Sequence, residues 1–142
     1  MKVDIGPYKN SDWNNDEGRK IDIHIDDYDI HNLDHTLALI TLPCLKKLKE
    51  QKQGSHNVDP LDVPQDIRQS EEDIQSYKAQ GLIDDNFNKR WDWVLDEMIF
   101  AMSSITEDDG LFDVSNPDYE NLQQRIQYGC YLFGKYFTCL WD

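Results

Sequence analysis

The sequence predicts a mostly helical α+β fold, in which a small antiparallel β-hairpin packs against three main helices. Two observations support this class. Apolar and polar residues alternate in two segments near the N-terminus, and apolar residues at three- and four-residue spacing mark the segments that follow. The chain has 142 residues, 39% of them hydrophobic, which is enough to bury a core. We therefore expect a single domain over residues 1–142.

The hairpin is predicted from two short alternating segments. Residues 2–5 alternate, and residues 20–26 do so more clearly, with three isoleucines on one side. The polar stretch between them, residues 10–18, is rich in turn-forming residues. An isolated hairpin is only marginally stable in water, so we expect helices to cover it.

A first helix is predicted to begin after Asn32, a good N-cap, and to stop at Gly54. Pro43 lies inside this helix, so we expect a kink or a break near residues 39–42. The buried stripe of the helix is expected to consist of Leu33, Leu37, Ile40, Cys44 and Leu48.

The middle of the chain is predicted to be less regular. Residues 55–69 contain two prolines and little periodicity, which indicates a loop over the surface. A short helix is expected over residues 71–80, capped by Ser70 and ended by Gly81.

The strongest helix is predicted from about residue 86 to residue 105, with Asp85 as its cap. Trp93 and Phe100 lie two turns apart on its polar face, and two aromatic rings there indicate that another group packs against them. Packing beneath the 55–85 loop, an oligomer contact and a stacking platform for a ligand are the three interpretations. The apolar face comprises Phe87, Trp91, Val94, Leu95, Met98, Met102 and Ile105.

A last helix is predicted to start near Asn116–Pro117 and to be apolar nearly all round, as in a helix at the centre of a domain or between subunits. Gly129 within it indicates a close helix crossing. Cys130 and Cys139 lie in this stretch and are expected to be buried free thiols, a usage that suits a reducing cytoplasm.

The net charge of the chain limits the classes of molecule that it can bind. It has 14 Lys and Arg against 28 Asp and Glu, a net charge of −14. Such a surface repels phosphate backbones and anionic membranes, so we expect no duplex nucleic acid and no membrane as partner. No apolar run approaches the length that spans a bilayer. A small anionic ligand held by a local group of cations remains compatible with the charge.

Motifs for catalysis or for cofactors are not found. The four histidines have no zinc-binding spacing, and no nucleophile or nucleotide-loop signature occurs. Asp92 and Asp96 lie one turn apart and are interpreted as a solvated helix face, with acid–base or metal work as the alternative. We therefore expect no enzyme activity, no cofactor and no metal.

The sequence offers more residues for binding an anion than for catalysis. Lys46, Lys49 and Lys52 crowd one helix end, and Lys89–Arg90 begin another helix, where the helix dipole already favours phosphate. Trp93 lies one turn from Lys89 and could stack on a base. A surface ion pair with an acidic neighbour is the alternative role of Arg90.

Five collinear stretches cover about half of the chain: Met1–Tyr8, Asp34–Lys49, Gly54–Pro64, Lys89–Ile99 and Arg125–Asp142. They resemble a widespread family of small proteins encoded by large contractile-tailed bacteriophages. The resemblance extends to the viral sponges that bind cyclic dinucleotide immune signals, the fourth anti-CBASS family. It implies a homo-oligomer, a dimer or a tetramer, that sequesters its ligand in the host cytoplasm without cleaving it. The segment over residues 10–18 is shorter than in that family, which bears on ligand specificity.

The leading hypothesis is therefore a phage anti-defence protein that binds a cyclic dinucleotide such as cGAMP. An acidic interaction module, or a nucleic-acid mimic that inhibits a host protein, is the alternative, which the charge of −14 favours. For the first hypothesis the expected ligand-binding residues are Lys89, Arg90, Lys46 and Lys49 for phosphates, Trp93 and Tyr8 for base stacking, and His56 for a base edge.

Overall fold

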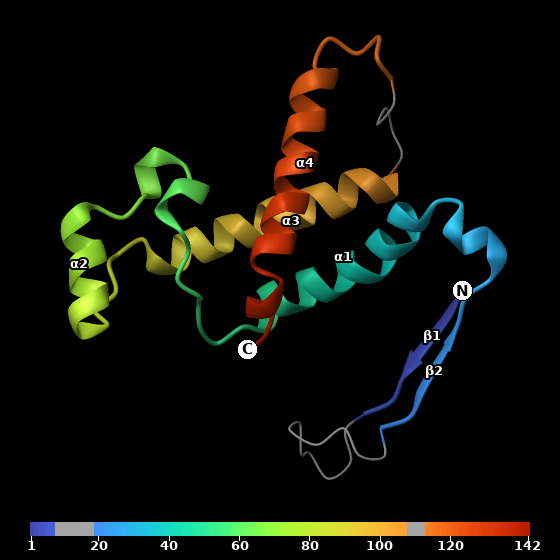
Figure 1. Cartoon of the computed structure of the whole chain (residues 1–142), viewed down its shortest axis with the longest axis horizontal. Helices are drawn as coiled ribbons and strands as arrows, with labels where there is room; N and C mark the ends of the chain where they lie inside the picture. The colour runs from blue at the N-terminus through green and yellow to red at the C-terminus, as the bar shows by residue number, and fades with distance from the viewer. Residues whose placement is uncertain (8–18, 108–112) are drawn as a thin grey trace. The chain divides into compact units, whose positions relative to one another are not determined.

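The computed structural model describes residues 1–7, 19–107 and 113–142 of the chain. These residues form a two-stranded antiparallel hairpin and four α-helices, with short 3₁₀ turns between them (Figure 1). The predicted α+β, mostly helical class is therefore confirmed. The chain divides into two compact units, Met1–Thr36 and Leu37–Asp142, which are described one at a time. A single domain over the whole chain stays a prediction.

The first unit contains the predicted hairpin. Strand β1, Lys2–Ile5, pairs antiparallel with strand β2, Ile21–His24. Val3 lies opposite Ile23 and Ile5 opposite Ile21, so the apolar side chains share one face, as the alternation predicted. These four side chains remain 40–60% exposed. Cover by helices stays a prediction, and the expected turn over residues 10–18 lies outside the described residues.

Helix α1, Leu33–Gln51, continues through Pro43, so the predicted break does not occur. The predicted buried stripe is also wrong over most of its length, because Leu33, Leu37, Ile40 and Cys44 are exposed. The helix buries a neighbouring stripe instead, centred on Ala38 and Leu45, with Leu42 and Leu48 partly buried beside it. Both stripes have helical spacing and apolar residues, so periodicity alone cannot say which one faces the core.

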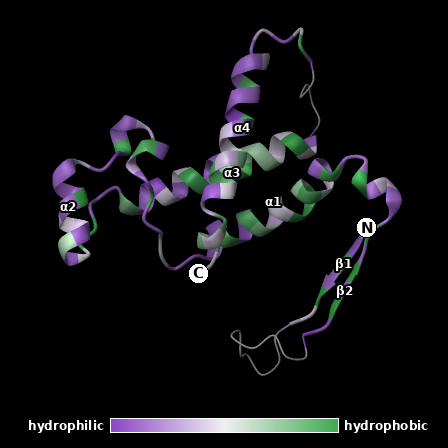
Figure 2. Ribbon diagram, in the orientation of Figure 1, coloured by the Kyte–Doolittle hydropathy of each residue, from purple (hydrophilic) through white to green (hydrophobic). Residues whose placement is uncertain are grey.

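Helix α2, Glu71–Gln80, has the predicted bounds and caps. The Ser70 side chain accepts a hydrogen bond from the Asp73 N–H, and Asp73 accepts one from the Ser70 N–H, which completes a capping box. Gly81 ends the helix at φ 69°, a left-handed conformation that glycine adopts without strain. No residue of α2 is buried, and Figure 2 shows hydrophilic residues over most of it.

Helices α3, Phe87–Glu107, and α4, Tyr119–Lys135, form the centre of the second unit, with α4 lying across α3 (Figure 1). Gly129 of α4 is packed against the backbone of Glu97 and the side chain of Ala101, which confirms the predicted close crossing. The largest buried side chains of the crossing and its core are Trp91, Arg90, Leu95, Met98 and Leu132.

Three details of these helices differ from the predictions. The capping carboxylate before α3 is that of Asp84 and not that of Asp85, because the Asn86 N–H donates a hydrogen bond to Asp84 Oδ1. Helix α4 begins at Tyr119, after a turn that takes up the predicted start at Asn116–Pro117. Cys130 is exposed and Cys139 only half-buried, because α4 buries the face of Ile126, Gly129 and Leu132 instead.

Candidate functional site

The lysines near the C-terminal end of α1 lie against carboxylates of α3. Lys49 Nζ lies 2.5 Å from Asp96 Oδ1, and Lys52 Nζ lies 3.0 Å from Asp92 Oδ1. The two aspartates, predicted to form a solvated face, are therefore ion-paired to the neighbouring helix. The same pairing neutralises the cation of Lys49, which the sequence assigned to a phosphate.

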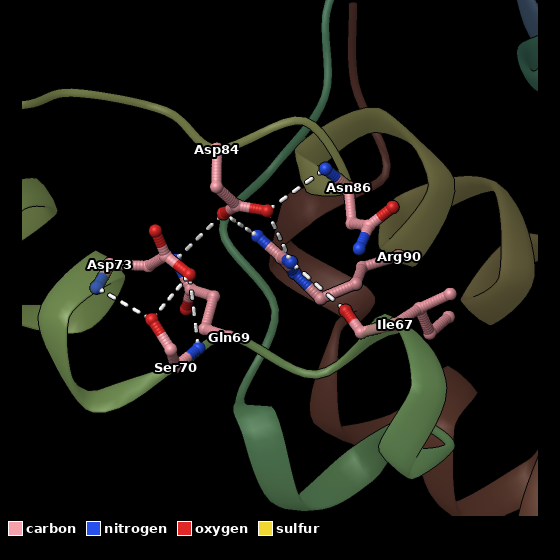
Figure 3. A network of polar contacts seen from close by, with 7 residues as sticks. All are labelled: Ile67, Gln69, Ser70, Asp73, Asp84, Asn86 and Arg90. Atoms are coloured by element: carbon pink, nitrogen blue, oxygen red, sulfur yellow. Dashed lines mark hydrogen bonds and ion pairs between the residues drawn. The ribbon is translucent and has the colours of Figure 1, made fainter.

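Arg90, predicted to bind phosphate or to pair at the surface, is fully buried. Its guanidinium donates to both carboxylate oxygens of Asp84, one of them at 2.9 Å, and to the carbonyl of Ile67 at 3.0 Å (Figure 3). Asp84 also accepts from the Gln69 side chain and the Asn86 N–H. Arg90 therefore ties the chain on both sides of α2 to α3, and its assignment as a ligand-binding residue is corrected, because its side chain does not reach the surface.

The other two predicted cations lie on different helices. Lys46 lies on α1 and Lys89 on α3, and both side chains are exposed. Neither has an ion-pair partner among the residues that the structure describes. Tyr8 lies outside the described residues. Of the predicted phosphate-binding residues, Lys46 and Lys89 therefore come from different helices, and the stacking role of Tyr8 stays a prediction.

Trp93 and Phe100 each have a partner on α4. The ring centroid of Trp93 lies 6.3 Å from that of Tyr128, and the guanidinium carbon of Arg125 lies 3.6 Å from the ring centroid of Phe100. Arg125 also forms a two-point ion pair with the buried Glu97, at 2.9 and 3.0 Å. Both aromatic residues thus hold α3 to α4, a role that none of the three sequence interpretations named.

His56 lies between two indole rings. Its ring centroid is 5.1 Å from that of Trp91 and 4.8 Å from that of Trp141, edge-on to both. One ring nitrogen is 3.3 Å from the carbonyl oxygen of Trp141. These contacts fasten the segment after α1 to the C-terminal residues, and the predicted base-edge role of His56 stays a prediction.

A polar network centred on Asp62 joins the loop over residues 59–62 to α4. Asp62 is 6% exposed, and its carboxylate accepts from the Tyr136 hydroxyl at 2.6 Å and the Tyr131 hydroxyl at 3.3 Å. The ammonium group of Lys135 bridges Asp62, at 2.6 Å, and Asp59, at 3.0 Å. Every charge in this network therefore has a partner, and one carboxylate is in excess.

The protonation states of the Asp62 network suit a fixed structure better than proton transfer. The hydrogen bond to Asp62 is the main cause that raises the pKa of Lys135 above its ordinary value. Burial, with the hydrogen bond to Asp62 next, raises the pKa of Tyr136. At neutral pH Lys135 therefore stays charged and Tyr136 stays neutral, so neither is poised as a base or a nucleophile.

Sequence reasoning missed this network, although it left a signal. Tyr128, Tyr131 and Lys135 follow one another at steps of three and four residues, which places their polar ends on one face of α4. That face was interpreted only as part of an apolar helix. Which loop would bring a carboxylate to it does not follow from spacing along the helix.

Two further features bear on the kind of site. Among the described residues, no group of three or more His, Cys, Asp or Glu side chains is placed to hold a metal ion. In the same part of the chain, no helix combines the length and the apolar character that a membrane span needs.

Comparison with known proteins gives no relative: no protein-family model matches the chain, and no curated protein or solved structure matches it significantly. The resemblance to the phage family therefore stays a prediction. What bears on function is the local geometry, above all which charged groups have partners and which do not.

Proposed function

We propose that the protein is a binding protein without catalytic activity, whose acidic surface takes a basic segment of another protein. The pairing of charges supports this proposal. Arg90, Lys49 and Lys52, which could have held phosphates, are each paired with a carboxylate. The net charge of −14 therefore leaves surplus carboxylates and few free cations at the surface.

Four of the surplus carboxylates lie on α2 or close to it in the sequence. Asp66, Glu71, Glu72 and Asp85 are exposed, and none of them has an ion-pair partner among the described residues. The helix dipole explains why two of them stand at the N-terminal end of α2, but it leaves their oxygens free. We call these four residues the acidic patch. Electrostatic attraction would speed the encounter of such a patch with a Lys- and Arg-rich segment.

Titration with a synthetic Lys- and Arg-rich peptide tests this proposal. We expect binding that weakens as salt is added, and a loss of about tenfold in affinity for Glu72→Lys, since one such charge reversal commonly costs about 1–2 kcal/mol. Glu120→Lys is the matched control, because Glu120 is also exposed but lies outside the acidic patch. Equal losses in both variants would mean that the peptide senses only the net charge, and the acidic patch would have no special role.

A cyclic dinucleotide is the second candidate ligand, and one observation favours it besides the resemblance. A hollow of about 590 Å³ lies along α1, with Lys47, Gln51 and Lys52 among its lining residues. Its volume is in the range of small-molecule sites, roughly 300–1,000 Å³. Two ammonium groups lie beside it, and because Lys52 is paired with Asp92 and Lys47 with Glu50, two phosphates would have to displace these carboxylates.

Isothermal titration with a panel of cyclic dinucleotides separates the two candidates. A sponge should bind one of them tightly, lose that binding in Lys47→Ala, and return the nucleotide unaltered after heat denaturation of the protein. Lys78→Ala is the control, because Lys78 is exposed on α2. Absence of binding heat with every member of the panel would eliminate the sponge and leave the protein partner.

A further inference from the structure

Two large apolar side chains stand at the surface between α2 and α3. Leu82 and Ile83 are 55% and 60% exposed, and neither belongs to the hydrophobic core that α3 and α4 form. We call these two residues the apolar pair. A single exposed leucine is common on protein surfaces, but two adjoining apolar side chains form a small patch that a partner can cover.

The segment that carries the apolar pair is fixed at both ends. Gly81 donates its N–H to the Tyr77 carbonyl at 2.8 Å and continues in a left-handed conformation. Asp84 accepts two hydrogen bonds from the guanidinium of the buried Arg90 (Figure 3). A segment fixed on both sides loses little conformational freedom when a partner binds, so binding to it costs less entropy.

The backbone of the same segment is also unpaired. Among the residues that the structure describes, no hydrogen bond involves the N–H or the carbonyl group of Leu82 or Ile83. Backbone groups at a protein surface bond either to water or to a bound chain. A peptide that lies along this segment can therefore bond to its main chain while its side chains contact the apolar pair.

Carboxylates surround the apolar pair. The Gln69 side chain donates to Asp84 Oδ2 at 3.3 Å, so the chain just before α2 lies beside the chain just after the apolar pair (Figure 3). Glu71 is two positions from the first of these residues, and Asp85 is one position from the second. Residues 66–85 hold six Asp and Glu against two Lys and Arg. An apolar patch among these carboxylates is complementary to a segment that is both apolar and basic.

We propose that the apolar pair takes apolar side chains of the partner, so that the basic segment is an amphipathic peptide in which Lys or Arg flank large apolar residues. This role rests on the proposed function and adds the chemistry that distinguishes one basic partner from another. Carboxylates alone attract any polycation and discriminate little between them. Contact with the apolar pair requires an apolar side chain at a fixed place in the partner, which makes the choice of partner more specific.

Titration with two matched peptides tests this role. Both carry the same number of lysines, which flank two leucines in one peptide and two serines in the other. For the natural chain we expect the leucine peptide to bind about tenfold more tightly, because it buries apolar surface that the serine peptide lacks. In the variant Leu82→Ser, Ile83→Ser the two peptides should bind equally, with the affinity that the serine peptide has for the natural chain.

Leu61→Ser is the control, since Leu61 is 78% exposed and lies in a different segment, and it should retain the preference for the leucine peptide. Equal affinities for the natural chain, or a preference that persists in Leu82→Ser, Ile83→Ser, would overturn the role of the apolar pair and leave the proposed function standing. Failure of both peptides to bind would overturn the proposed function as well. A melting temperature of the unbound double variant clearly below that of Leu61→Ser would show that the chain itself covers the apolar pair, which would also overturn this role.

Discussion

Arg90 and Lys49 carry the same charge, and their surroundings give them different roles. The Arg90 side chain is 1% exposed and donates to the Asp84 carboxylate and the Ile67 carbonyl, whereas that of Lys49 is 34% exposed and reaches one carboxylate. A buried guanidinium without its carboxylate would be strongly destabilising, so Arg90 and Asp84 stabilise the fold only as a pair. The pair between Lys49 and Asp96 contributes little to stability, because solvent screens exposed ion pairs.

The Arg90 pair predicts a specific response to acid. Arg90 lowers the pKa of Asp84 from 3.8 to about 2. The charged form is favoured in the folded chain, so this contribution, about 2 kcal/mol, is present above pH 3.8 and is lost as the pH falls towards 2. Urea unfolding should therefore show Asp84→Asn to be less stable than the natural chain at neutral pH, by an amount that shrinks as the pH falls towards 2.

Asp85→Asn is the control for this measurement, because Asp85 is exposed and has no ion-pair partner among the described residues. Its stability relative to the natural chain should hardly change over the same pH range. A constant difference for Asp84→Asn at all pH values would mean that the Arg90 contact does not favour the charged carboxylate.

At the scale of elements, the crossing of α3 and α4 depends on the absence of a side chain at Gly129. A Cβ there would meet the carbonyl oxygen of Glu97 and would lie 2.6 Å from the Cβ of Ala101. Gly129→Ala should therefore destabilise the fold by about 1–3 kcal/mol, the usual cost of overpacking. Gly134→Ala in the same helix meets nothing within 4 Å and should be neutral or stabilising by about 0.5–1 kcal/mol.

Chemical denaturation of both variants measures this difference. Similar stabilities for the two would indicate that α3 and α4 move apart at little cost. Comparing Gly129→Ala with Gly134→Ala separates the cost of the steric contact with α3 from the change in helix propensity, because both variants replace a helical glycine by alanine.

Elements were easier to predict from the sequence than their faces. The bounds of α2 followed from Ser70 and Gly81, because capping residues act on backbone groups a few positions away and can be identified from the sequence alone. The outward stripe of α1 was taken for the inward one, because periodicity gives an angle around the helix but not the direction of the core. The Asp62 network could not be predicted, since it joins a loop to a helix more than 60 residues away. The site prediction failed in the same way at Arg90, where the partners Ile67 and Asp84 come from segments before the helix.

For the molecule as a whole, the net charge of −14 acts against the folded state through repulsion among carboxylates. Added salt screens this repulsion more than it weakens the few exposed ion pairs, so the melting temperature should rise with sodium chloride at constant protein concentration. The variant Asp66→Lys, Glu72→Lys has a net charge of −14 + 4 = −10 and should show a smaller rise. A melting temperature that falls with salt would mean that ion pairs contribute more to stability than repulsion removes.

The hydrogen bond between Asp62 and Tyr136 also bears on the order in which the chain folds. It joins residues 74 positions apart, so forming it closes a long loop, whose entropy must be lost before the contact stabilises anything. The crossing of α3 and α4 closes a much shorter loop, since Arg125 and Glu97 are 28 positions apart. The crossing is therefore the better folding nucleus, and the Asp62 network closes after it. Substitutions at Tyr136 should then mainly accelerate unfolding, whereas those at Gly129 should slow folding. The Asp62 network therefore slows the unfolding of the native chain and contributes little to the rate at which it folds.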